Sequence, residues 1–277
     1  MTDFFTAADG TRLAYEDTGE GVPVLALAGL TRNRRDFDFV APHLTGVRLI
    51  RMDYRGRGES DWPGPETYTL QHEGADALAL LDHLGVERAG LLGTSRGGLI
   101  GMGLAALAPD RLLGLCLNDI GPDIAPEGLA AIMTYLGKPP VAKTLDEAAA
   151  QRAAFFEASG FEGVAPEVWR REAGHAFRET PEGLALTYDA RLREAVEAMA
   201  GAPLPDLWPL FRAAALRPLA LIHGANSNIL SAATVARMRA EAPAMRVADV
   251  PGRGHVPFLD EPEALAVIRA WIGDMAA

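Results

Sequence analysis

Cysteine is nearly absent from this chain of 277 residues. Cys116 is the only one, so no disulfide can form within the chain. It lies in the apolar run LLGLCLN, and such surroundings favour a buried structural thiol over a reactive one. The sequence therefore predicts that Cys116 belongs to the core of the protein.

Long apolar runs and an excess of positive charge are also absent. No stretch is long and apolar enough to span a bilayer, and the first residues, MTDFFTAADG, carry an early acid and no apolar core of signal-peptide length. The net charge is −11 and the pI is about 5.0, which argues against nucleic acid and anionic membranes as partners. We therefore expect a cytoplasmic protein that acts on a small molecule. The sequence does not indicate its oligomeric state.

Internal repeats are missing, and nothing in the sequence signals a metal site or an organic cofactor. What is present is a regular alternation of patterns. Continuous apolar runs suit strands that are buried on both faces of a parallel sheet; examples are VPVLALAG, VRLIRMD, AGLLGT, LLGLCLND and PLALIHG. Helical patterns separate them, at about residues 36–44, 71–84, 97–107, 232–241 and 262–275. This alternation predicts an α/β fold in which helices cover both faces of the sheet.

The alternation stops between about residues 123 and 205. This stretch is rich in Ala and Glu, has helical periodicity, and contains no convincing buried strand. We interpret residues 124–205 as a helical cap inserted into a core formed by residues 1–123 and 206–277. Segments that follow the carboxyl ends of strands surround the ligand crevice in open α/β sheets. The alternative is helical packing that plays no part in a site.

The most informative motif is Gly93-Thr94-Ser95-Arg96-Gly97, between an apolar run and a small-residue helical pattern. The G-x-S-x-G pattern in this context indicates a nucleophile elbow, a strained turn that exposes the serine. Glycines are needed there because a Cβ would collide with neighbouring backbone. The helix dipole then favours negative charge beside the serine. We predict that Ser95 is a nucleophile.

A serine nucleophile needs a proton acceptor near neutral pH, and histidine is the usual one. His255 lies in VPGRGHVPFLDEPEAL, between the last predicted strand and the last predicted helix. That loop leaves the same edge of the sheet as Ser95. We therefore predict that His255 is the general base, whereas His223 and the four other histidines fall in contexts that suit structural or surface roles.

Acyl transfer creates an oxyanion that fixed hydrogen-bond donors must stabilise. In elbow enzymes one donor is the backbone N–H after the serine, here that of Arg96, and another comes from the loop after an earlier strand. That loop is LALAGLTRN, and we choose the N–H of Leu30 as the second donor. The alternative for Leu30 is a plain core residue at the start of the loop.

Taken together, these motifs resemble the α/β-hydrolase superfamily, in particular its small capped serine esterases and lactonases. The AGL loop, DYRGRGESD, GTSRGG, HGANSNIL and GRGHVPF follow one another in the family order. The resemblance implies an α/β-hydrolase fold: a mostly parallel eight-stranded sheet, helices on both faces and a helical cap. It also implies hydrolysis of a carboxylic ester or lactone through an acyl-serine. Carbon–carbon bond hydrolysis and a non-catalytic ligand receptor are alternatives on the same fold.

The sequence departs from the family pattern at the expected triad acid. The loop after PLALIHG should end in Ser-Asp, and this chain has Ser227-Asn228. An amide neither fixes the histidine tautomer well nor stabilises the imidazolium. Three explanations remain open: Asn228 replaces an acid in a slowed, engineered variant; the acid has moved to Asp119 or Asp123; or the protein is a poor enzyme that serves as a binder. We favour the first, with residue 228 beside His255.

Two groups of residues are candidates for substrate recognition. Three arginines follow the oxyanion loop, and Arg32 is the one placed best to reach a substrate carboxylate. A solvated basic face is the alternative. Six of the aromatic residues in the cap either line an apolar pocket or form the core of the cap; these six are Tyr135, Phe155, Phe156, Trp169, Phe177 and Tyr188.

Overall fold

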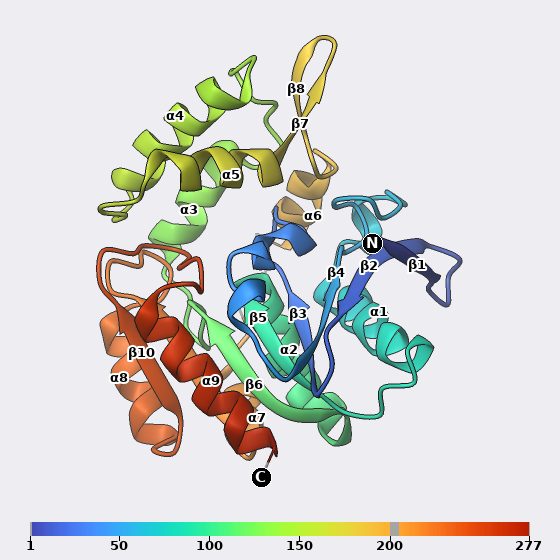
Figure 1. Ribbon diagram of the computed structural model, residues 1–277, viewed down its shortest axis with the longest axis vertical. Coiled ribbons are helices and arrows are strands. Elements are labelled where there is room, and N and C mark those ends of the chain that lie inside the picture. Colours follow the sequence, from blue (N-terminus) through green and yellow to red (C-terminus); the bar gives the residue numbers. More distant parts are fainter. Residues whose placement is uncertain (1, 200–204, 277) are drawn as a thin grey trace.

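A single eight-stranded sheet forms the centre of the protein in the computed structural model, which describes residues 2–199 and 205–276 (Figure 1). The strands lie in the order β1-β2-β4-β3-β5-β6-β9-β10, and from β4 onward neighbouring strands are parallel. Their bounds are β1 Asp3–Thr6, β2 Arg12–Thr18, β3 Val22–Leu27, β4 Val47–Met52, β5 Ala89–Thr94, β6 Leu112–Asn118, β9 Leu219–Gly224 and β10 Arg246–Val250. This confirms the predicted fold class.

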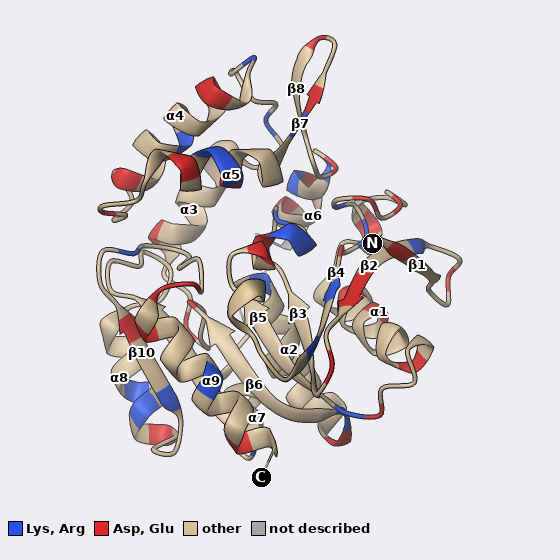
Figure 2. Cartoon of the chain, in the orientation of Figure 1, with Lys and Arg blue, Asp and Glu red and all other residues tan. Residues whose placement is uncertain are grey.

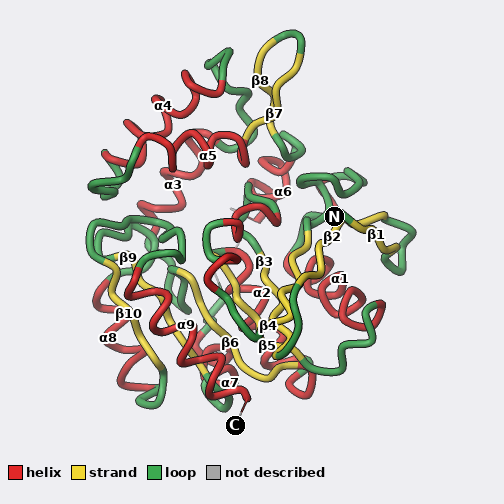
Figure 3. The backbone as a smooth tube through the Cα atoms, in the orientation of Figure 1, coloured by secondary structure: helices red, strands yellow, loops and turns green. Residues whose placement is uncertain are grey.

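Helices cover both faces of this sheet (Figure 3). One face packs against α1 (Leu70–His83), α2 (Arg96–Leu107), α7 (Trp208–Ala214) and α8 (Ala232–Glu241). The other packs against α9 (Pro262–Ala276) and the short 3-10 helices η1 (Arg34–Asp38) and η2 (Ala41–His43). Two further 3-10 turns are η3 (Pro65–Thr67) and η4 (Pro109–Arg111). Of the helices in the described ranges, none combines the length and the apolar character that crossing a membrane requires.

Alternating side chains of the central strands feed two separate hydrophobic clusters. In β6, Leu115 and Leu117 join the cluster under α2, whereas Cys116 points to the cluster under α9. Cys116 is fully buried, and burial raises the pKa of its thiol far above the usual range. Strands β3, β5 and β6 carry no charged residue, as Figure 2 shows by their uniform tan colour. Continuous apolar runs thus mark strands buried on both faces.

Residues between β6 and α7 form a separate layer above the sheet (Figure 1). This cap segment contains α3 (Pro126–Tyr135), α4 (Leu145–Glu157), α5 (Pro166–Ala176), β7 (Phe177–Thr180), β8 (Gly183–Leu186) and α6 (Leu192–Met199). The cap that we predicted ends at residue 205, and its residues 200–204 lie outside the described residues. The cap is built mainly from helices, as its periodicity predicts.

Two local predictions are wrong. Residues 183–186 form the second strand of an antiparallel hairpin with β7, although we read them as helical. Pro181 and Gly183, the latter at a φ of 125°, make a tight turn that breaks the helical pattern there. Residues 36–44, which we predicted as one helix, contain the end of η1 and the whole of η2, and Pro42, without an N–H, is the second residue of η2.

Candidate active site

The Ser95 turn has the strained geometry of an elbow between β5 and α2. Ser95 has a φ of 49°, which a residue with a side chain rarely adopts. A Cβ added to Gly93 would lie 2.5 Å from the backbone of Gly97, and one added to Gly97 would lie 2.0 Å from the carbonyl oxygen of Leu27. Both glycines are therefore required by close packing, and the turn leaves the serine side chain at the carboxyl edge of the sheet.

His255 reaches Ser95 from the loop that follows β10. Its Nε2 atom lies 3.0 Å from Ser95 Oγ, which is hydrogen-bond distance. The loop approaches the cap closely, because a Cβ on Gly254 would lie 2.2 Å from the carbonyl oxygen of Ser159. Among the described histidines, only His255 contacts the serine, so the structure joins the two residues that we predicted as nucleophile and base.

Asp119, directly after β6, binds the other ring nitrogen of His255. Its Oδ2 atom lies 2.8 Å from His255 Nδ1, and the side chain is completely buried. Two more groups hold the same carboxylate: the backbone N–H of Gly224 donates to Oδ1 at 2.8 Å, and the Ser227 hydroxyl donates to Oδ2 at 2.6 Å. A carboxylate on Nδ1 keeps the proton there, so Nε2 is left to accept the proton of Ser95.

This geometry corrects our prediction for residue 228. Asn228 is exposed and makes no hydrogen bond with His255; the preceding residue, Ser227, contacts the acid instead. The turn from Gly224 to Ser227, closed by a 2.8 Å backbone hydrogen bond, directs Asn228 away from the histidine. Asp119 was our alternative acid. The other alternative, Asp123, accepts a hydrogen bond from Trp208 Nε1 at 3.0 Å and takes no part in the relay.

The expected oxyanion donors flank the serine. A Cβ on Gly29 would lie 3.8 Å from Ser95 Cβ, so the loop that carries Leu30 passes close to the nucleophile. Within residues 2–199 and 205–276, no acceptor is found for the N–H of Leu30 or of Arg96. Two unsatisfied N–H groups beside a serine are the arrangement that stabilises an oxyanion.

A buried ion network, which sequence reasoning missed, links the two donors. Arg57 donates from Nε to the carbonyl oxygen of Leu30 at 3.0 Å, and its Nη1 lies 2.9 Å from Glu73 Oε1. The other oxygen of Glu73 accepts from Arg96 Nε at 2.5 Å. Glu73 is completely buried, so one carboxylate pairs with an arginine beside each of the two expected donors. Arg57 is one of several residues of the DYRGRGESD segment that contact the oxyanion loop.

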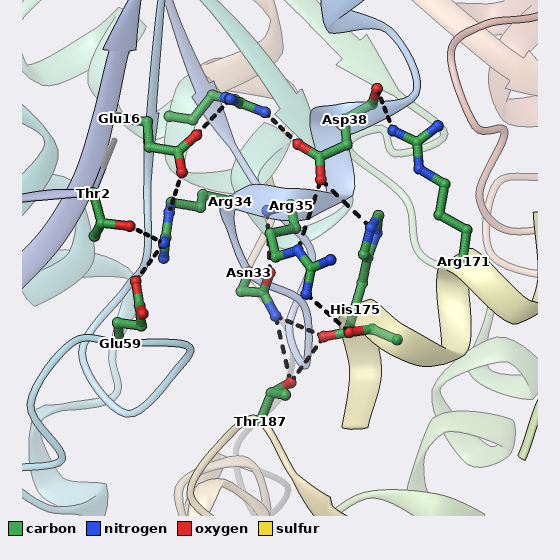
Figure 4. Close-up of polar contacts among 12 residues, drawn as sticks. Thr2, Glu16, Asn33, Arg34, Arg35, Asp38, Glu59, Arg171, His175 and Thr187 are labelled. Atoms are coloured by element: carbon green, nitrogen blue, oxygen red, sulfur yellow. Dashed lines mark hydrogen bonds and ion pairs between the residues drawn. The ribbon is translucent and has the colours of Figure 1, made fainter. Parts of the chain in front are cut away.

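The rest of the oxyanion loop is fastened to the core on one side and to the cap on the other (Figure 4). The backbone N–H of Arg34 donates to Asp53 Oδ1 at 2.7 Å, and its guanidinium pairs with that carboxylate. On the cap side, Asn33 Nδ2 donates to the carbonyl oxygen of His175 at 2.8 Å, and Arg35 donates to that of Gly174 at 3.0 Å. Hydrogen bonds thus join the segment after the oxyanion loop directly to α5 of the cap.

A cavity of about 400 Å³ lies between the serine and the cap. Ser95 and His255 form part of its floor. Much of its wall is apolar and includes Leu30, Ile132, Phe155, Phe156, Leu186 and Val256. Of the six cap aromatics, five line this cavity, and Trp169 instead stacks on Phe156 with 5.2 Å between ring centroids. The volume suits a small organic molecule.

Arg32 also lies in the cavity wall, as we predicted for one of the three arginines. Its Nη1 atom pairs with Asp36 Oδ1 at 2.5 Å. Glu172 and Arg152, from the cap, form a second ion pair in the same wall. Arg34 and Arg35 have the structural contacts described above, so Arg32 is the arginine of this loop that faces the cavity.

The sequence pattern of the Alpha/beta hydrolase family matches residues 24–268. The chain belongs to this family. It contains both the serine–histidine pair and the sheet on which that family is built, and the family relationship confirms the resemblance inferred from the motifs. The family is one of hydrolases.

Individual relatives agree with this assignment. The chain is 36% identical, over 92% of its length and 91% of the relative's, to a 3-hydroxybutyrate-oligomer hydrolase of Cupriavidus necator. An α/β hydrolase from Novosphingobium aromaticivorans has a TM-score of 0.92 and 39% identity, over 99% of this chain and 98% of that one. A malate-bound thermophilic esterase from Thermogutta terrifontis has a TM-score of 0.77 and 26% identity, over the full length of both chains.

Proposed function

We propose that the protein is a serine hydrolase that cleaves carboxylic esters of short hydroxy acids through an acyl-serine intermediate. The observation that carries this proposal is the hydrogen-bonded series from Ser95 through His255 to Asp119 at the floor of a capped cavity. Each group has the partner that its role requires. The nucleophile contacts a base, and a buried carboxylate orients that base.

The reaction follows from these contacts. Ser95 Oγ attacks the ester carbonyl carbon while His255 Nε2 takes its proton, and the N–H groups of Leu30 and Arg96 stabilise the resulting oxyanion. The carbon–oxygen bond of the ester then breaks, and His255 gives its proton to the departing alcohol. Water, activated by the same histidine, hydrolyses the acyl-serine and regenerates the enzyme. Asp119 stabilises the imidazolium in both halves.

The substrate class rests on the relative from Cupriavidus necator, whose name describes hydrolysis of 3-hydroxybutyrate oligomers. The coverage of both chains is above nine-tenths, so the likeness includes the cap as well as the core. The cavity supports this choice, since it combines apolar side chains for methyl groups with charged side chains for a carboxylate. A lactone is an internal ester and is open to the same mechanism.

A fluorophosphonate probe tests the mechanism, because it labels only an activated serine. We expect labelling at Ser95 and turnover of a short-chain aryl ester. Ser95→Ala should abolish both while the protein stays folded, since only the nucleophile is lost. Ser231→Ala is the matched control: Ser231 caps α8, and its loss should cost about 1 kcal/mol of stability without affecting labelling. An unlabelled wild type would point to a ligand receptor and contradict the proposal.

A substrate panel tests the reaction class. Carboxylic esters and lactones of different acyl lengths should be cleaved, whereas a vinylogous diketone, the substrate type of carbon–carbon bond hydrolysis, should not. Ser95-dependent cleavage of the diketone alone would overturn the ester assignment and leave the nucleophile in place.

A further inference from the structure

We infer that Arg32 binds a free carboxylate on the alcohol half of the ester, an inference that rests on the function proposed above. Arg32 and Ser95 border the same small space. A Cβ on Gly29 would lie 3.3 Å from Arg32 Cδ and 3.8 Å from Ser95 Cβ. Both side chains therefore lie next to Gly29, and all three residues line the cavity, so a substrate bound to the serine would lie near the arginine.

The guanidinium of Arg32 has an unused edge. Its Nη1 donates to Asp36, and no hydrogen-bond partner of Nε or Nη2 occurs in the described part of the chain. The side chain is 20% exposed, and it lines the cavity. Nε–H and Nη2–H form the side-on fork with which arginine binds both oxygens of a carboxylate. Because Asp36 holds Nη1, the guanidinium is fixed in place with Nε–H and Nη2–H left free for a carboxylate.

The charge of the cavity wall also favours one anion. Among the described residues the wall contains three cations, Arg32, Lys138 and Arg152, and two carboxylates, Asp36 and Glu172. His175, also in the wall, is neutral at pH 7 because burial lowers its pKa to about 4. Among the side chains that line the cavity, cations therefore outnumber carboxylates by one, although the whole chain has a net charge of −11. A substrate with one carboxylate neutralises the wall.

A hydroxy acid ester carries its carboxylate close to the ester bond. In a 3-hydroxybutyrate dimer, four covalent bonds separate the ester carbonyl carbon from the carboxylate carbon, a span of about 5 Å when extended. When the ester bond breaks, the alcohol oxygen takes the proton from His255, and the product leaves as 3-hydroxybutyrate with its carboxylate on Arg32. The enzyme would thus remove one carboxyl-terminal unit in each turnover.

The test compares the 3-hydroxybutyrate dimer with its methyl ester at the carboxyl end, because the two share the same internal ester bond. The wild type should have a KM for the free acid about tenfold lower than that for the methyl ester, as a charge-assisted fork predicts. Arg32→Met should remove this difference mainly by raising KM for the free acid, and Arg32→Lys should restore part of it. Equal KM values in the wild type, or an undiminished preference in Arg32→Met, would overturn the inference.

The matched control is Arg170→Met. Arg170 is also a cap-side cation, but it is exposed, pairs with Asp146 at 2.6 Å and lies outside the cavity. This variant should keep the preference for the free acid, which separates a local fork from a general loss of positive charge. Loss of the preference in Arg170→Met as well would contradict a specific role of Arg32.

Product inhibition provides a measurement on the wild type alone, so the test stands even where Arg32→Met fails to fold. 3-Hydroxybutyrate should compete with the methyl-ester substrate about tenfold more strongly than methyl 3-hydroxybutyrate does. Equal inhibition would overturn the inference. Failure here is distinct from failure of the proposed function: Ser95-dependent cleavage without preference for the acid refutes only the role of Arg32, whereas absence of labelling and of cleavage refutes the serine hydrolase itself.

Discussion

The chain after β6 and the chain after β9 leave the same edge of the sheet, and each starts with polar residues suited to a triad. Asn118 ends β6 and Asp119 follows it directly, whereas Ser227-Asn228 begins three residues beyond the end of β9. Asp119 is buried against His255, whereas Asn228 is exposed. The strand next to the nucleophile strand thus supplies the carboxylate, and the next strand supplies only its hydrogen-bond donors. In this chain the family motif thus indicates the correct edge of the sheet for the acid, but it indicates the wrong strand.

Of the substitutions that test this comparison, Asp119→Asn should lower kcat most. The amide cannot hold His255 in the productive tautomer or stabilise its charge, and in serine proteases the same change lowers kcat about 10⁴-fold. Steady-state kinetics on a short-chain ester measures this, with circular dichroism to verify the fold. The double variant Asp119→Asn, Asn228→Asp should stay equally slow. Recovery of activity in the double variant would show that residue 228 can act as the acid.

Asn118→Ala should have the next largest effect on kcat, because the Asn118 side chain joins the end of β6 to the strand that leads into Ser95 and to the loop that carries His255. Its side-chain Nδ2 donates to Thr94 Oγ1 and to the carbonyl oxygen of Pro257, both at 3.1 Å. Removing this buried amide should cost about 1–3 kcal/mol of stability and lower kcat about tenfold or more. Urea unfolding measures the loss of stability, and steady-state kinetics measures the change in kcat.

The control for that change is Asn226→Ala on the β9 side. The exposed Asn226 donates to the carbonyl oxygen of Gly160 at 2.9 Å, so its loss should cost less than about 1 kcal/mol. Equal losses of stability and of kcat in the two variants would mean that the chain after β9 supports the site as much as the end of β6 does.

Ser227→Ala should have a moderate effect. The Ser227 hydroxyl donates to Asp119 at 2.6 Å, and losing one charge-assisted hydrogen bond of about 1.5 kcal/mol corresponds to about tenfold in kcat. KM should change little, since this hydroxyl lies behind the acid. Ser227→Thr keeps the hydroxyl and should retain most of the activity. A variant with raised KM and unchanged kcat would assign Ser227 to substrate binding instead.

Asn228→Asp should have the smallest effect. The side chain is exposed and forms no hydrogen bond with His255, so an added charge is screened by water and kcat should stay within about threefold of the wild type. Asn228→Ala should behave alike. If Asn228→Asp raised kcat for the same ester by several orders of magnitude, residue 228 would be the position of the acid after all.

Much of the site could be predicted because its signals are local in the sequence. The Ser95 elbow is contiguous, and His255 stands in the loop after the last strand; both predictions agree with the geometry. The acid could not be assigned, since it depends on how the chain turns after each strand. Asp119 adopts a φ of 54°, which rotates its side chain back to the histidine, and the sequence contains no mark of this. Glu73 was missed for a related reason: an acid in an amphipathic helix usually faces water.

Cys116 in the middle of β6 gives the protein a native reporter of sheet opening. Its thiol is enclosed between β5 and β9 and beneath α9, and burial disfavours the reactive thiolate. A maleimide added to the folded protein therefore reacts only in molecules in which α9 has lifted from the sheet or the central strands have transiently separated. The same strand leads directly into Asp119. The modification rate of the native thiol therefore reports how often the structure opens around this strand, and no cysteine has to be introduced.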